Sequence, residues 1–152
     1  KMTAPKYRDI KMEDVPVINI DGGIARVVAS GDEELPGASS GDFVPLTMLD
    51  ITLEPGAGFT RKTGENDTVF AYIFEGSGIF GRSRQPFSAR HALLTGEGDT
   101  FSIAAGENGM RLVLCESKAL REPIAWGGPI VMNTREELQR AFDELDEGTF
   151  IK

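Results

Sequence analysis

The stretch PGAGFTRKTGENDTVFAYIFEG, residues 55–76, decides the fold class. Pro55 and Gly56 stop an alternating run, and a polar, Gly-containing corner then leads into TVFAYIFEG (68–76), which is apolar on both faces. A strand, a corner and a second, buried strand in this order are typical of the entrance to a small β-barrel that presents ligands to a metal. No histidine lies in the stretch, so a metal at this entrance would need other donors.

Short strands are predicted before this stretch. VINI (17–20) and IARVVAS (24–30) flank a turn signal at 21–23 and predict a hairpin. In MLDITLEPG (48–56), apolar and polar residues alternate, which is the period of a strand with one face in water. Residues 31–43 are rich in acidic, Gly, Pro and Ser residues and indicate an exposed loop.

Strand signals continue after it. SGIFG (77–81) is predicted to fold back as the hairpin partner of residues 68–76. Residues 91–117 give three more strand candidates separated by glycines. Short strands at this spacing, in a chain with 18 glycines and 8 prolines, predict an all-β sandwich or barrel.

Only the end of the chain has a helical pattern. Thr134 and Glu137 form a capping box, in which each side chain satisfies an otherwise unpaired backbone N–H at the helix start. Apolar residues then recur with helical spacing at Leu138, Phe142 and Leu145. We therefore divide the chain into an arm or linker (1–16), a barrel (17–132) and a C-terminal helix with its tail (133–152).

Composition limits the function classes. The 152 residues suit one domain, which at this size buries roughly 70% of its unfolded surface. The net charge of −8 disfavours direct binding to nucleic acid or to an anionic membrane. No run approaches the roughly 20 apolar residues of a membrane span. The single cysteine, Cys115, allows no disulfide within the chain, which fits a reducing compartment, and we expect a cytoplasmic location.

Two segments carry a family resemblance. The tail EPIAWGGPIVMNTREELQRAFDELDEGTF (122–150) resembles the C-terminal signature of the pirin family, and KMTAPKYRDI (1–10) resembles the segment that joins the two domains of a pirin. Pirins are bicupins, built from two tandem jelly-roll barrels, and the resemblance covers this chain as the second barrel. It implies a cupin-type jelly-roll barrel with one C-terminal α-helix, and an N-terminal cupin domain of the same protein as partner, with other proteins as further candidates.

The resemblance also locates the ligand positions of a metal-bearing cupin. Aligned through PGAGF, the first three positions hold Lys62, Gly64 and Thr68, and the second motif, GDTFSIAAGENG (98–109), places Gly109 roughly at the fourth. A lysine cation repels a divalent metal, glycine has no donor atom and a neutral hydroxyl is a poor ligand for iron, nickel or zinc. One histidine in the chain cannot make a site with two or three histidine ligands. We therefore expect no metal or other cofactor here, and iron only in the N-terminal cupin domain.

Arg61 and Lys62 are the predicted ligand contacts. Lys62 is expected to point into the barrel mouth, where it would pair with Glu65 or Asp67, extend into solvent or bind an anionic ligand. Glu65 and Asp67 lack the ordered oxygen spacing of a calcium loop.

No catalytic residue is predicted. His91 begins an apolar run with no identified acid or thiol partner, and Cys115 lies mid-strand, where a cysteine usually acts as a small hydrophobe. Trp126 is expected to be a core residue or an interdomain contact, and the acidic end of the helix (143–147) to face solvent or a basic partner.

Three functions remain open from the sequence. The first is a structural or interaction role, in which residues 1–16 and the apolar helix stripe contact a metal-bearing N-terminal cupin. The second follows from the resemblance, because some pirins resemble flavonol (quercetin 2,3-) dioxygenases and others nuclear transcription cofactors; this domain would be the non-catalytic half. The third is a small anionic ligand bound in the barrel.

Overall fold

The computed structural model describes residues 6–83 and 85–150. Contacts divide the described residues into two compact units: one contains 10–119, and the other contains 120–150 together with residues 6–9. The sequence placed 120–132 in the barrel, whereas the structure groups this segment with the helix. The reason is local pairing, because β9 (Ala125–Gly127) pairs only with β10 (Ile130–Met132) and both strands contact α1 (Arg135–Asp146).

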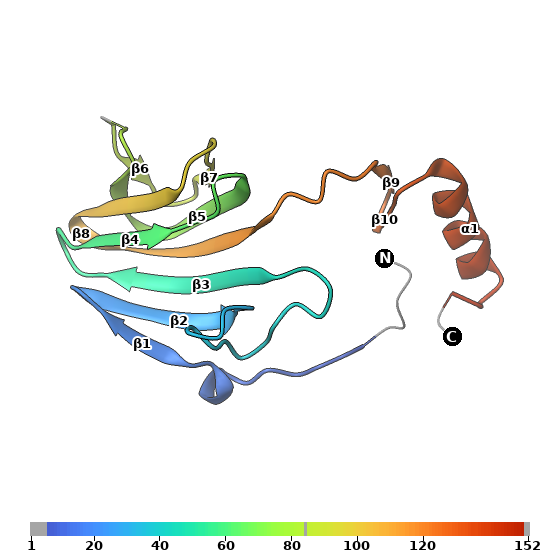
Figure 1. Cartoon of the computed structure of the whole chain (residues 1–152), viewed down its shortest axis with the longest axis horizontal. Helices are drawn as coiled ribbons and strands as arrows, with labels where there is room; N and C mark the ends of the chain where they lie inside the picture. Colours follow the sequence, from blue (N-terminus) through green and yellow to red (C-terminus); the bar gives the residue numbers. More distant parts are fainter. Residues whose placement is uncertain (1–5, 84, 151–152) are drawn as a thin grey trace. The chain divides into compact units, whose positions relative to one another are not determined.

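The larger unit is an antiparallel β-structure, as expected (Figure 1). A 3₁₀ turn at Met12–Asp14 precedes its strands, which are β1 (Val17–Ile20), β2 (Gly23–Ala29), β3 (Leu46–Leu53), β4 (Gly58–Lys62), β5 (Asp67–Phe80), β6 (Phe87–Ser88), β7 (Ala92–Leu94) and β8 (Thr100–Lys118). The path runs β1-β2-β3-β8-β5-β6, while β4 also pairs with β8 and β7 with β5. The predicted β1–β2 hairpin and all-β class are confirmed.

Alternating apolar residues build the core of the barrel. In β3 every second side chain is buried, and β5 and β8 follow the same alternation except in their middle, at 74–77 and 106–110. The fully buried side chains are Ala25, Val27, Leu49, Ile51, Ile73, Ala71, Leu112 and Leu114. On the outer face Arg111 donates two hydrogen bonds to Asp50 (3.0 and 2.9 Å) and ties β8 to β3. The hydrogen bond with Asp50 is the main reason that the pKa of Arg111 is raised.

The predicted hairpin between 68–76 and 77–81 is wrong. These residues form one strand, β5, which continues through register irregularities at 73–78 and stays paired with β8. Gly76 makes this bend possible, since its φ is +74° and a Cβ there would collide with the carbonyl oxygen of Gly109. The chain bends where we expected it to turn.

The smaller unit packs one helix on one hairpin. Thr134 accepts a hydrogen bond from the Glu137 amide, and the Glu137 carboxylate accepts one from the Thr134 amide (both 3.1 Å), so the capping box is confirmed. Its hydrophobic cluster comprises Ile130, Met132, Ala141, Leu138 and Phe142. Among the described residues, α1 and every other helix are too short or too polar to cross a membrane.

Candidate functional site

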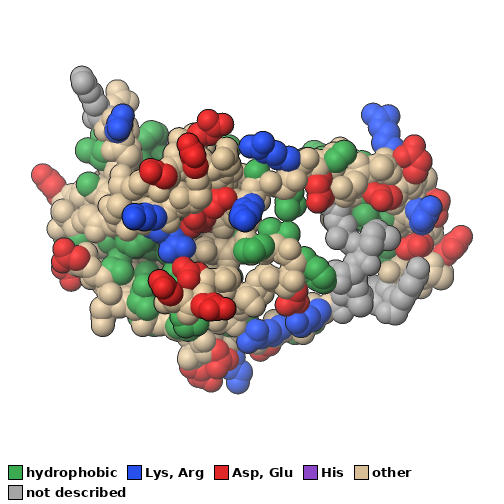
Figure 2. Space-filling view, viewed as in Figure 1, with side chains coloured by type: hydrophobic (Ala, Val, Ile, Leu, Met, Phe, Trp, Pro, Cys, Tyr) green, Lys and Arg blue, Asp and Glu red, His purple; other side chains and the backbone are tan. Residues whose placement is uncertain are grey.

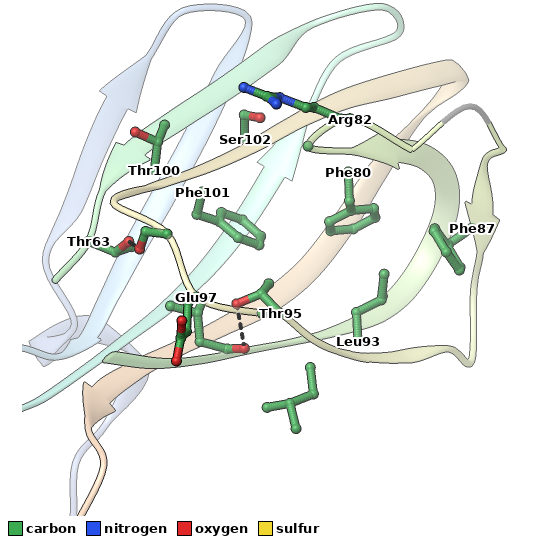
Figure 3. Close-up of a pocket in the computed structure, with 15 residues that line it drawn as sticks. Thr63, Phe80, Arg82, Phe87, Leu93, Thr95, Glu97, Thr100, Phe101 and Ser102 are labelled. Atoms are coloured by element: carbon green, nitrogen blue, oxygen red, sulfur yellow. Dashed lines mark hydrogen bonds between the residues drawn. The ribbon is translucent and has the colours of Figure 1, made fainter. Parts of the chain in front are cut away.

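A cavity of about 390 Å³ lies among strands β4 to β8 and the loop between β7 and β8 (Figure 3). Its apolar lining consists of Val69, Phe80, Phe87, Leu93, Leu94 and Phe101. Phe80 and Phe101 are 9% and 4% exposed and belong to the barrel core. The inner wall of the cavity is therefore held by the same packing that stabilises the barrel.

Three phenylalanine rings meet inside this cavity. Phe80 packs edge to face with Phe87 at a centroid distance of 6.1 Å and with Phe101 at 6.0 Å. Such a geometry is the favoured one for aromatic pairs, because the positive ring edge meets the negative ring face. The rings come from β5, β6 and β8, and their mutual contacts fix the shape of the cavity before any ligand arrives.

The rim of the cavity is polar and rich in hydrogen-bond acceptors. Thr63 Oγ1 donates to the Gly98 carbonyl (3.3 Å), Thr95 Oγ1 to the Val69 carbonyl (3.3 Å), and Thr100 Oγ1 to the Asp99 carboxylate (2.9 Å). These hydroxyl protons are thus already in use, and the oxygens that line the cavity are left to accept.

Two charged side chains complete the rim. Arg82 and Glu97 both line the cavity, and Figure 3 shows Arg82 in its upper part and Glu97 at its lower left. No ion pair joins them in the described part of the chain. Each charge therefore keeps its hydrogen-bonding capacity for another group.

Arg61 and Lys62 take different positions from those expected. The inward residues of β4 are Phe59 and Arg61, and Lys62 is exposed, so the prediction that Lys62 points into the mouth is wrong. Arg61 Nε donates to the Glu116 carboxylate at 2.7 Å, and the two side chains are 20% and 9% exposed. Neither Arg61 nor Lys62 lines the 390 Å³ cavity. Their role as ligand contacts stays a prediction.

Comparison with known proteins identifies the domain. Residues 48–151 match the family model described as the pirin C-terminal cupin domain. The chain belongs to the pirin family. This confirms the resemblance drawn from the tail and the cupin fold class.

Relatives of this pirin domain are longer proteins. It is 34% identical to Pirin-1 of Arabidopsis thaliana, with 95% of this chain and 51% of the relative covered, and 32% identical to a pirin-like protein of Caulobacter vibrioides, with 99% and 54% covered. A crystal structure of quercetin 2,3-dioxygenase from Acinetobacter baumannii superposes with a TM-score of 0.87 and 32% identity, covering 99% of this chain and 52% of that one. The chain spans about half the length of these relatives.

The four positions aligned with metal ligands do not form a donor set in this pirin domain. Lys62 and Thr68 are exposed, the Gly64 amide donates to the Asp67 carboxylate (3.1 Å), and Gly109 lies against the Leu53 carbonyl. Across the described residues, no group of three or more His, Cys, Asp or Glu side chains could hold a metal ion. An ammonium, a hydroxyl and two glycines do not fit iron, copper, nickel or zinc.

His91 and Cys115 lie in different environments and contact different residues. His91 is exposed, its Nδ1 is 2.9 Å from the Ser88 carbonyl and its ring packs edge to face with Phe87. Cys115 lies in β8, is half-buried, and burial raises the pKa of its thiol. A raised pKa keeps the thiol neutral, which is the opposite of what an activated nucleophile needs.

Trp126 is not a core residue of the described chain. It is 74% exposed, because α1 covers the other side of the β9–β10 hairpin and leaves the face of Trp126 and its pairing partner Val131 open. Its indole Nε1 donates to the Gly128 carbonyl at 2.7 Å, which satisfies the polar atom and leaves the apolar ring exposed. Two residues of the helix stripe, Leu138 and Phe142, pack on the hairpin, whereas Leu145 is 45% exposed; contact of the stripe with a partner stays a prediction.

Proposed function

We propose that this pirin domain is a metal-free C-terminal cupin domain that packs against a metal-bearing N-terminal cupin domain and supports it. The residues at the aligned ligand positions, Lys62, Gly64, Thr68 and Gly109, are unsuited to bind a transition metal, and this supports the first part of the proposal. The length of the relatives, about twice that of this chain, supports the second. A cytoplasmic location belongs to the same proposal and is supported by the lone Cys115.

The observation that carries the proposal is an apolar surface on the smaller unit. We call it the tail surface, and its members are Leu120 (56% exposed), Ile124 (77%), Trp126 (74%) and Val131 (44%). Single exposed apolar residues are ordinary, but four from one short segment, two of them directly paired across a hairpin, favour an interaction site. Tryptophan is the residue most enriched among those that dominate binding energy.

The negative net charge disfavours nucleic acids and anionic membranes as partners. On the face shown in Figure 2, acidic and basic side chains are interspersed, and the net charge is −8. The electrostatic contribution that drives binding to phosphate backbones or anionic lipids is therefore unfavourable. An apolar protein surface remains the partner that the tail surface suits.

Mixing the two halves tests the proposal. The chain is labelled with 5-fluorotryptophan at Trp126, its only tryptophan, and titrated with the part of the Acinetobacter baumannii protein that this chain does not match, produced separately. We expect a complex and a shifted ¹⁹F resonance. Trp126→Ser removes the label, so its affinity is measured by titration calorimetry beside the unlabelled parent; it should weaken the complex at least about 30-fold, the effect of losing one dominant contact of about 2 kcal/mol.

The matched control is Phe43→Ser. Phe43 is 75% exposed on a loop of the larger unit and is not part of the tail surface. It should leave the affinity unchanged. If no complex forms at high micromolar concentration, or if both variants weaken binding equally, the support role fails.

A dioxygenase role belongs to the second hypothesis. The Acinetobacter baumannii relative is named a quercetin 2,3-dioxygenase, and in a parent protein with that activity this domain would be the non-catalytic half. We expect the 152-residue chain alone to leave flavonols unchanged with or without added iron or copper. Metal-dependent turnover by the isolated chain would contradict this assignment.

A further inference from the structure

We infer that the 390 Å³ cavity binds a small planar aromatic carboxylic acid that carries a hydrogen-bond donor, such as an amine, on the far side of its ring. This binding site goes beyond the support role, because it uses the inside of the barrel and not the tail surface. Arg82, Glu97 and the phenylalanine-lined wall are the groups that select this ligand class.

The apolar wall selects the ring. The cavity volume of about 390 Å³ lies at the small end of the range for ligand pockets, about 300–1,000 Å³, which suits a ligand with one or two rings. Phe80 packs edge to face with both Phe87 and Phe101, so the wall that a planar guest would meet contains aromatic side chains held in fixed positions. A saturated ring of the same size would lose aromatic contacts with them.

The acceptor side of the rim selects a donor. The protons of Thr63, Thr95 and Thr100 are given to protein oxygens, and Glu97 adds a carboxylate. A ligand group that only accepts hydrogen bonds would find no partner among these three hydroxyls. An amine supplies the missing N–H groups.

Arg82 at the rim selects a ligand that carries an acid. Among the described residues that line the cavity, Arg82 is the only lysine or arginine, and its planar guanidinium can hold a carboxylate with two parallel hydrogen bonds. Arg82 and Glu97 both line the cavity and no ion pair joins them among the described residues, so a ligand with a donor and an acid at the two ends of a ring can satisfy both.

The probe is 4-aminobenzoate, titrated into the ¹⁵N-glycine-labelled 152-residue chain. The amides of Gly81, Gly96 and Gly98 line the cavity and report occupancy by NMR. We expect saturable shifts with a Kd below about 1 mM, which is reasonable for a ligand of this size. Benzoate and its saturated counterpart cyclohexanecarboxylate carry the same charge, and cyclohexanecarboxylate should bind about fivefold more weakly than benzoate.

Two rim variants separate the contributions of the charges. Arg82→Gln should weaken 4-aminobenzoate about tenfold and leave aniline binding unchanged, because aniline has no acid. Glu97→Ala should weaken aniline and leave benzoate unchanged. Arg140→Gln, an exposed arginine on α1, is the matched control and should change nothing. All three positions are exposed, so folding is expected to survive.

Three results would overturn the inference. The first is an absence of shifts at the three glycines at millimolar 4-aminobenzoate. The second is an equal loss of affinity in Arg82→Gln and Arg140→Gln. The third is equal affinity for the aromatic and saturated probes. None of these depends on the N-terminal partner, so the inference and the support role can fail separately.

Discussion

Removing one residue of the Arg61–Glu116 ion pair should destabilise the barrel, whereas replacing both residues with apolar ones should leave its stability nearly unchanged. The N–O distance is 2.7 Å, and the side chains are only 20% and 9% exposed. At an effective dielectric constant of about 20, the gross attraction at this distance is about 6 kcal/mol, and desolvation of both groups offsets most of it. Removing one partner leaves the other charge poorly solvated within the barrel.

We predict that Glu116→Leu and Arg61→Met each destabilise the barrel by about 2–3 kcal/mol, a value reduced from that of fully buried pairs because Arg61 retains some solvent contact. The midpoint of thermal unfolding, followed by far-UV circular dichroism, should fall by about 5–10 °C in each single variant. The double variant should recover to within about 1 kcal/mol of the parent, because two apolar side chains replace the pair without leaving a charge.

The double-mutant cycle makes the reasoning refutable. If the effects of the two single variants simply add in the double variant, the two residues are not coupled. If both single variants unfold at the parental midpoint, the pair is a surface contact of little energy. Either result would contradict the assignment of a strongly coupled, partly buried Arg61–Glu116 pair.

Three further predictions follow from local geometry. Thr134→Ala removes the acceptor of the Glu137 amide and should cost about 1 kcal/mol, seen as faster hydrogen exchange in the first turn of α1 with unchanged barrel unfolding; equal exchange rates would disprove the cap. Gly109→Ala should destabilise the barrel by at least about 2 kcal/mol, because φ is +71° and the new Cβ would lie 2.6 Å from the Leu53 carbonyl, whereas Gly96→Ala, which meets no atom within 4 Å, should be tolerated in chemical denaturation. Cys115 should react with a thiol reagent at pH 8 at least about tenfold more slowly than free cysteine, because burial raises the pKa of its thiol and lowers the thiolate fraction; a rate equal to that of free cysteine would contradict the assignment.

The fold was largely readable from local patterns. The alternation of Leu49, Ile51 and Leu53 predicted β3, and the capping box predicted α1. The hairpin error at 77–81 arose because Gly-Ser-Gly can turn a chain or bend a strand, and only the pairing of β5 with β8 decides between the two. That pairing joins residues distant in sequence, which a local pattern does not contain.

The site was less readable. Whether Arg61 or Lys62 points inward depends on the register of β4 against β8, and a shift of one residue exchanges the two. Sequence reasoning also missed the cavity, because its lining comes from separate strands and a loop. The recurrence of Phe80, Phe87 and Phe101 in a glycine-rich region was the available signal, but each alone is an ordinary core residue.

Exposure of Trp126 has a similar origin. An aromatic residue followed by Gly127, Gly128 and Pro129 suggests a packed corner, and the corner does form, with Gly127 in close approach to the Phe142 ring. Only one side of a two-stranded hairpin can be covered by one helix. The side that holds Trp126 is left exposed, and a local sequence pattern does not tell which side of the hairpin the helix will cover.

Metal content after loading tests the central claim most directly. The purified 152-residue chain is incubated separately with iron, copper, nickel and zinc, passed through a desalting column and measured by elemental mass spectrometry beside the separately produced N-terminal cupin half of a pirin relative. The account predicts that only the N-terminal half retains stoichiometric metal. Stoichiometric metal retained by this chain, and lost on substitution of its own residues, would contradict it.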